Sequence, residues 1–188
     1  MTTGWATALT TLLVLLSTVT SNANELYVNQ VGDRLNLKVV QKGPGNRTDL
    51  VLTGNDNTVD TSQHVGTNTL GYQWITVDIA GDSNNTTLIQ QDYDNKYMDI
   101  DIVGDNNTVS VLQKDDGPYT TNISLTGNDH SVTGIQAGTG SHSSDITLTN
   151  AGGAYSVYFE QVSSTTQSYT FTGFCANTAG CSAVVTQY

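Results

Sequence analysis

The feature that most constrains the fold of this chain is an internal repeat of about 23 residues. One position is glycine or asparagine in every copy, and its successive spacings are 22, 27, 23, 23, 23 and 23 residues. We call these residues the pivots: Gly32, Gly54, Gly81, Gly104, Gly127, Asn150 and Gly173. Glycine and asparagine tolerate a positive φ best, so we expect a tight turn at each pivot. A period of this length is typical of repeat architectures, in which each unit packs on its neighbours.

A glutamine recurs near the end of each copy. It stands nine residues after the pivot in five copies, and small insertions displace it in the last two. These glutamines are Gln41, Gln63, Gln90, Gln113, Gln136, Gln161 and Gln187. A buried amide without a partner is costly, so the recurrence predicts a ladder of stacked glutamine side chains, as in cross-β assemblies. Three residues after the pivot, Asn57, Asn84 and Asn107 are expected in the turn, where asparagine can satisfy nearby backbone groups.

Each copy is predicted to form a strand, a turn and a second strand. The residues four and two before the pivot are apolar, and the residue between them is mostly polar, which is the alternation of a half-buried strand. The apolar pairs are Leu50/Leu52, Val77/Ile79, Ile100/Ile102, Ile123/Leu125, Ile146/Leu148 and Tyr169/Phe171. In the second strand, Ile89, Leu112 and Ile135 fall on the outer face and predict an external apolar row. We therefore expect an all-β solenoid of about seven strand-turn-strand repeats, with cross-β-like stacking.

The N-terminal residues differ from the repeats. Residues 5–19 are almost uncharged and apolar, and Ser21-Asn22-Ala23 places small residues where a signal peptidase cleaves. This layout predicts a secretory signal peptide at 1–23 and a single solenoid domain at 24–188. The formal net charge of −11 argues against nucleic acid and anionic membranes as partners, because the long-range field repels both.

The repeats resemble the curlin repeats of curli, the amyloid fibres of bacterial surfaces. Curlin repeats follow the pattern Gln-x-Gly-x-x-Asn-x-(small or apolar)-x-x-x-Gln. The matching residues are Gly54, Asn57, Val59 and Gln63, then Gly81, Asn84, Thr86 and Gln90, then Gly104, Asn107, Val109 and Gln113. Gln30 also supplies the leading glutamine of the first copy, whereas later copies carry Leu52, Ile79, Ile102, Leu125, Leu148 and Phe171 there. One ladder of the family is thus apolar in this chain.

The resemblance implies a subunit exported through the periplasm that polymerises into an extracellular fibre of the biofilm matrix, with roles in adhesion and surface colonisation. It implies as partners other copies of the chain, a related curlin subunit, an outer-membrane secretion channel and periplasmic chaperones. A major fibre subunit and a minor nucleator are both compatible with the sequence. The alternative function is a monomeric, capped solenoid that acts as an adhesin or surface-binding module.

Other candidate sites are few. Cys175 and Cys181 are expected to form a disulfide in an oxidising compartment, either as a local staple of a loop or as part of a C-terminal cap. Turn aspartates raise the question of calcium, but the nonapeptide of calcium-binding β-rolls is absent. His64, His130 and His142 are expected at turn or loop positions without a shared partner. No catalytic motif, metal-ligand cluster or cofactor site is recognisable, so we expect no enzyme.

Overall fold

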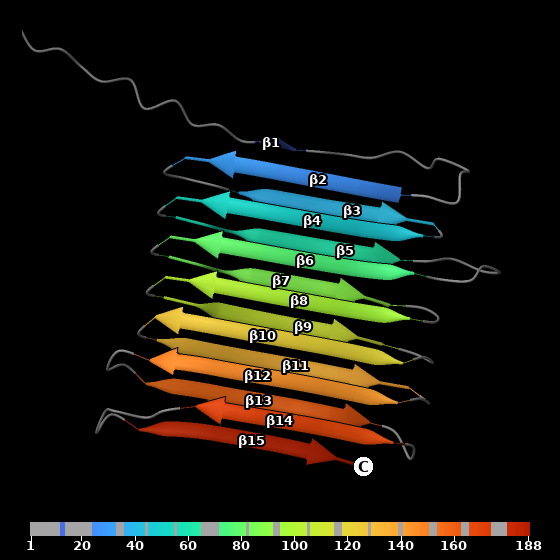
Figure 1. Cartoon of the computed structure of the whole chain (residues 1–188), viewed down its shortest axis with the longest axis vertical. Helices are drawn as coiled ribbons and strands as arrows, with labels where there is room; N and C mark the ends of the chain where they lie inside the picture. The colour runs from blue at the N-terminus through green and yellow to red at the C-terminus, as the bar shows by residue number, and fades with distance from the viewer. Residues whose placement is uncertain are drawn as a thin grey trace, which may run out of the picture.

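The computed structural model describes residues 12–13, 24–32, 36–43, 45–54, 56–64, 72–81, 83–91, 95–104, 106–114, 118–127, 129–138, 141–150, 154–162, 166–173 and 180–188. In this part of the chain the regular structure is β-strand, and no helix that could cross a membrane occurs. The chain winds so that each turn adds one strand to each of two facing parallel sheets (Figure 1). The predicted all-β solenoid is confirmed.

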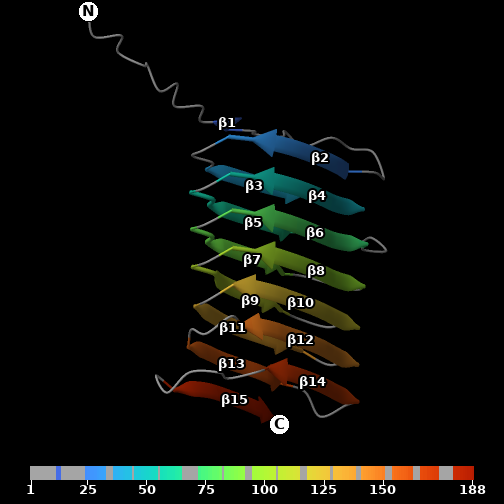
Figure 2. The same ribbon diagram turned by 60° about the vertical axis from the view of Figure 1, so that its left-hand side comes forward.

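The strands divide into two sheets by number, as Figure 2 shows with the odd-numbered strands on the left and the even-numbered strands on the right. The even-numbered sheet contains β2 (Asn24–Val31), β4 (Asn46–Thr53), β6 (Gln73–Ala80), β8 (Lys96–Val103), β10 (Tyr119–Gly127), β12 (His142–Asn150) and β14 (Gln167–Gly173). The odd-numbered sheet contains β1 (Leu12–Leu13), β3 (Leu37–Lys42), β5 (Val59–His64), β7 (Thr86–Gln90), β9 (Thr108–Gln113), β11 (His130–Ala137), β13 (Tyr155–Val162) and β15 (Cys181–Gln187).

The core lies between the two sheets and consists of rows of apolar side chains that run along the stacking axis. In the even-numbered sheet one row pairs Val28, Leu50, Val77, Ile100, Ile123 and Ile146 in register. Each such side chain contributes about 1.5–3 kcal/mol when fully buried. All the buried apolar residues of the cluster lie between Val28 and Phe159, so a chain that begins at Asn24 contains the whole of this core.

One core layer departs from the aliphatic pattern. Phe159 on β13 is completely buried and pairs with Gly134 on β11. A Cβ atom on Gly134 would lie 2.1 Å from Cε2 of Phe159. The missing side chain of Gly134 therefore provides the volume that the Phe159 ring occupies.

The register of the last repeat differs from the prediction. We aligned Gly173 with the pivot Asn150, but the structure pairs Gly173 with Leu148 and Phe171 with Ile146. Tyr169 and Phe171 are thus opposite Ser144 and Ile146, two positions away from the predicted alignment with Ile146 and Leu148. Gly173 lies in β14 and is not in register with the pivot Asn150. The physical reason is core packing, because this register keeps Phe171 against the core and beside the Tyr155 ring, at 5.6 Å between ring centroids.

Candidate assembly site

The seven predicted ladder glutamines form one column in the odd-numbered sheet. Every successive pair is in register, from Gln41 opposite Gln63 to Gln161 opposite Gln187. Gln63, Gln90, Gln113, Gln136 and Gln161 are fully buried. The column therefore runs through the whole described solenoid and reaches both of its ends.

The ladder amides from Gln41 to Gln161 form hydrogen bonds in two directions. Along the axis, Nε2 of Gln63 donates to Oε1 of Gln90 at 2.9 Å, and the same distance separates the next two links, Gln90 to Gln113 and Gln113 to Gln136. Across the sheets, Nε2 of Gln63 also donates to the backbone carbonyl of Trp74 at 3.0 Å. Related bonds join Gln41 to Arg47, Gln90 to Tyr97, Gln113 to Thr120 and Gln161 to Ser168. The column thus ties consecutive turns together and ties the two sheets at one corner.

The direction in which the glutamines donate along the axis reverses between Gln136 and Gln161. Gln136 and Gln161 both donate through Nε2 to Oγ of Ser144, at 2.8 and 3.1 Å. The Ser144 hydroxyl therefore replaces the direct amide bond at this step. Beyond it, Nε2 of Gln187 donates back to Oε1 of Gln161 at 2.6 Å.

The predicted turn asparagines form a second, shorter ladder. Nδ2 of Asn84 donates to Oδ1 of Asn57 at 2.7 Å, and Nδ2 of Asn107 donates to Oδ1 of Asn84. His130 occupies the next place in this column, with Nδ1 2.6 Å from Oδ1 of Asn107 and Nε2 3.3 Å from the carbonyl oxygen of Thr149. The expectation that His64, His130 and His142 lie in turns or loops is wrong, because all three are strand residues and His130 and His142 are buried.

The pivot glycines have a different role from the one expected. Gly81, Gly104 and Gly127 do not have a positive φ. Instead, a Cβ atom on Gly104 would lie 1.6 Å from the carbonyl oxygen of Gly81 and 2.4 Å from Oδ1 of Asn84. Glycine is required here because consecutive turns approach too closely for any side chain and because the asparagine ladder fills the adjacent space.

A third buried column was missed by the sequence analysis. It lies at the start of the even-numbered strands, eight residues before the first six pivots, and comprises Asn24, Asn46, Gln73, Lys96, Tyr119 and His142. Gln167, in register with His142, continues it, and the two end members Asn24 and Gln167 are half-buried. Lys96 is only 1% exposed, with Nζ 4.6 Å from the centroid of the Tyr119 ring, and that ring stacks on His142 at 4.7 Å. Extending the period-2 alternation two steps towards the N-terminus of each repeat could have located this column.

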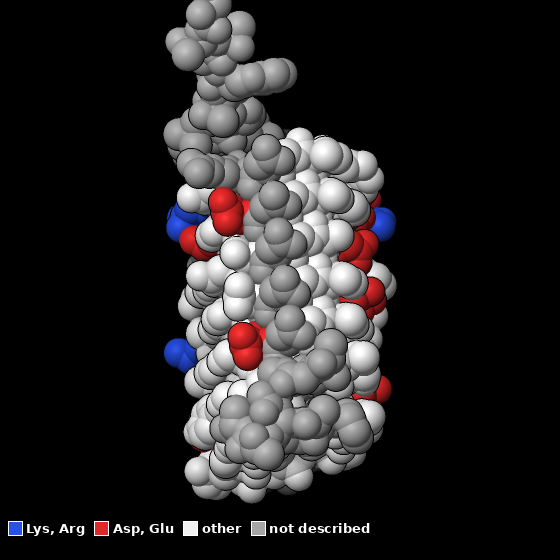
Figure 3. All heavy atoms as spheres, turned by 90° about the vertical axis from the view of Figure 1, so that its left-hand side faces the viewer, with Lys and Arg blue, Asp and Glu red and all other residues white. Residues whose placement is uncertain are grey.

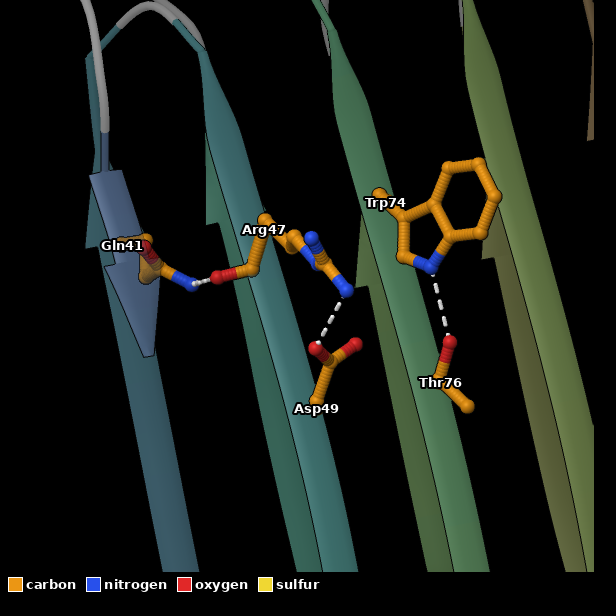
Figure 4. Close-up of polar contacts among 5 residues, drawn as sticks. All are labelled: Gln41, Arg47, Asp49, Trp74 and Thr76. Atoms are coloured by element: carbon orange, nitrogen blue, oxygen red, sulfur yellow. Dashed lines mark hydrogen bonds and ion pairs between the residues drawn. The ribbon is translucent and has the colours of Figure 1, made fainter. Parts of the chain in front are cut away.

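The outer face of the even-numbered sheet is acidic. Asp49, Asp78, Asp99 and Asp101 project from neighbouring strands β4, β6 and β8. Burial, and then the charges of Asp101, Asp99 and Asp49, raise the pKa of Asp78 above its ordinary value. Figure 4 shows the polar contacts at the same face: Arg47 pairs with Asp49 at 2.9 Å, and Nε1 of Trp74 donates to Thr76 at 2.7 Å. Trp74 also stacks on Tyr97, with 4.3 Å between ring centroids.

The remaining predicted site residues lie at the ends. Cys181 is disulfide-bonded, and its predicted partner Cys175 lies outside the described residues. Gly32 and Gly54 directly follow β2 and β4. The backbone N–H of Gly32 donates to the carbonyl oxygen of Thr53, and that of Gly54 donates to the carbonyl oxygen of Ala80. Asn150 ends β12, opposite Gly127. Within the described residues no group of histidine, cysteine, aspartate and glutamate side chains could hold a metal ion.

The two ends of the stack present strand edges. At the C-terminal end, β14 and β15 are the last strands of their sheets. At the N-terminal end, β2 is the last strand of the even-numbered sheet, whereas β3 pairs with the two residues of β1. Leu26 and, at the other end, Tyr169, Phe171 and Val185 are partly buried and continue the core rows to these edges.

Comparison of the chain with models of protein families, with curated proteins and with solved structures gave no match.

Proposed function

We propose that this protein is an exported structural subunit that assembles end to end into a curli-like amyloid fibre. The observation that carries the proposal is the in-register glutamine column, which runs to both ends of a parallel strand stack. An incoming copy could continue this column and both sheets without any change of fold. In the internal register, the next copy would set its Val28 beside Phe171 and its Gln41 beside Gln187.

The composition of the C-terminal edge supports addition of another chain. Natural sheets protect their edges with charged residues, proline, bulges or covering segments. The sequences of β14, QSYTFTG, and β15, CSAVVTQ, contain no charged residue and no proline. Within the described residues no further strand pairs with their outer edges, so these edges form a template for a further parallel strand.

The N-terminal edge becomes available under the same proposal. Leu12 and Leu13 pair with Leu37 and Lys38, so β1 occupies the open edge of β3 in the full chain. Cleavage after Ala23, as the signal-peptide prediction implies, removes β1 and leaves β3 free to pair with the β15 of another copy. Export, a related subunit, a secretion channel and chaperones remain part of the proposal through the resemblance to curlins.

The proposal is tested with a charge placed at the C-terminal edge. Val185 faces inward opposite Phe159, whereas its neighbour Val184 is 48% exposed on the outer face. Val185→Lys should slow seeded fibre elongation by at least about tenfold, because the ammonium group would be buried against the incoming copy. Thr172→Lys, at an exposed outer position of β14 in the even-numbered sheet, is the matched control and should elongate like the parent chain.

Seeded growth is followed by thioflavin T fluorescence on the chain 24–188, with circular dichroism to show that each variant is folded. Equal elongation rates for Val185→Lys and Thr172→Lys would contradict end-to-end addition. A parent chain that remains soluble and monomeric would favour the capped adhesin instead.

A further inference from the structure

The outer face of the odd-numbered sheet carries a row of half-buried apolar side chains, which ends at Glu160, in register with Ile135. Ile89, Leu112 and Ile135 form an in-register row on β7, β9 and β11, so the predicted external row is present. Tyr158 on β13 and Val184 on β15, in register with each other, extend the apolar surface towards the C-terminal end and are 41% and 48% exposed. We call these five residues the lateral face. Val162, in register with Ala137, borders it and is 38% exposed.

Charge is distributed unequally between the two outer faces. Over β6, β8 and β12 the even-numbered sheet exposes Asp78, Asp101 and Asp145, and Asp99 is half-buried on the same face. The strands of the lateral face contribute one carboxylate, Glu160, which accepts a hydrogen bond from Tyr158 at 3.1 Å. Seen from the turns in Figure 3, acidic side chains gather along the right-hand edge, which belongs to the even-numbered sheet.

This distribution determines which partner can approach. The chain has a net charge of −11, so two copies repel each other unless their acidic faces point apart. Contact between two lateral faces satisfies that condition, because it places both even-numbered sheets on the outside. It also brings together rows with the same spacing of about 4.8 Å, which can interdigitate at about 10 Å between sheets. The same surface lacks the ring of lysine and arginine residues that would favour an anionic membrane.

We propose that the lateral face binds the lateral face of a second copy, so that solenoids pair side by side through their odd-numbered sheets. Leu112 is at the centre of this contact, because its column continues through Ile89 on one side and Ile135 on the other. The contact is isologous, with the same surface used by both copies. Because the contact between two single molecules involves only five residues from each, single solenoids form a weak dimer. In a fibre each stacked molecule adds another such contact, so stacked solenoids pair strongly.

The test uses Leu112→Lys, with Ser124→Lys as the matched control. Ser124 is an exposed residue of β10 on the opposite, even-numbered face, so the control adds the same charge away from the contact. All variants of the chain 24–188 also carry Val185→Lys, which separates lateral pairing from growth at the ends. Sedimentation equilibrium at high micromolar concentration should show a dimer for the Val185→Lys parent and for the Ser124→Lys variant, and a monomer for Leu112→Lys.

A dimer that survives Leu112→Lys, or a Val185→Lys parent that is monomeric throughout, would overturn the inference. Leu112→Thr serves as a second variant if the lysine prevents folding, because threonine suits an exposed strand position. Fibres of the chain without Val185→Lys provide an independent readout: Leu112→Lys should give single filaments, and Ser124→Lys paired ones. If no variant forms fibres, end-to-end growth is contradicted while the sedimentation result still decides lateral pairing.

Discussion

Two kinds of side chain give this solenoid its specificity, and both are amides. From Gln41 to Gln161 the ladder glutamines hydrogen-bond both along the axis and to the other sheet, so their position is fixed in two directions. The turn asparagines hydrogen-bond to one another beside the pivot glycines, whose missing side chains leave the space. Buried polar groups that hydrogen-bond to one another favour a single arrangement, because a slip in register would leave several of them unpaired.

The glutamine ladder predicts a large effect of a single truncation in its interior. Gln90→Ala removes the acceptor of Gln63 and the donor to Gln113, so two buried amide groups lose a partner. The free energy of unfolding should fall by about 2–4 kcal/mol. The adjacent Gln91→Ala, on the outer side of the chain, should change it by less than about 0.5 kcal/mol. Urea denaturation of both variants measures the difference in their free energies of unfolding. Similar losses for Gln90→Ala and Gln91→Ala would show that the glutamine ladder does not account for the loss of stability.

His130 predicts a pH dependence with a definite sign. Burial lowers the pKa of His130 below 6.5, and the hydrogen bond to Thr149 and the charge of Asp129 only partly oppose this. The unfolded chain therefore binds the proton first, and stability falls as the pH drops below 6.5 towards the lower folded pKa.

The substitution His130→Asn should remove this loss and extend the asparagine ladder by one residue, since position 130 follows Asn107 in the column. Thermal unfolding between pH 7 and 5 tests it. The parent should lose more stability than His130→Asn. Parallel pH profiles for the parent and His130→Asn would contradict this role.

Among the strands, packing between neighbouring turns decides which residues are tolerated. Most inward positions of β5 to β11 hold aliphatic residues or threonine, but β11 and β13 combine the smallest and one of the largest side chains in register. Such a pair keeps the total volume of the layer constant while its shape changes. The same principle explains the register of β14, where Phe171 packs beside Tyr155 in the last layers of the core.

This complementarity predicts compensation between two substitutions. Gly134→Ala should destabilise the chain by about 1–3 kcal/mol, because its Cβ would overlap the Phe159 ring. Phe159→Leu should lose stability through a cavity, and the double variant should be more stable than the sum of the two effects implies. A double-mutant cycle of denaturation midpoints gives the interaction energy, and strict additivity would mean that the two residues do not compete for space.

For the molecule as a whole, the solenoid fold and most of its strand register could be predicted, because the register follows the spacing of the ladder glutamines in the sequence. The register of the last repeat was not, because an inserted segment moves Gly173 into a strand and the position of Phe171 depends on packing that the period does not encode. The column that contains Lys96, Tyr119 and His142 was also missed, since polar residue types conceal burial. The close approach at Gly104 could be found only from the distance between consecutive turns.

The central claim is that complete solenoids stack end to end, and the mass per unit length of single filaments tests it most directly. Each molecule contributes seven layers to the even-numbered sheet, so one chain should occupy ~33 Å of a filament at 4.7–4.8 Å per layer. Scanning transmission electron microscopy of Leu112→Lys fibres should give a mass per unit length that equals the mass of one chain per ~33 Å. Diffraction from these fibres should show the 4.7–4.8 Å meridional reflection. Fibres with a different mass per length, or a chain that stays monomeric, would contradict the account.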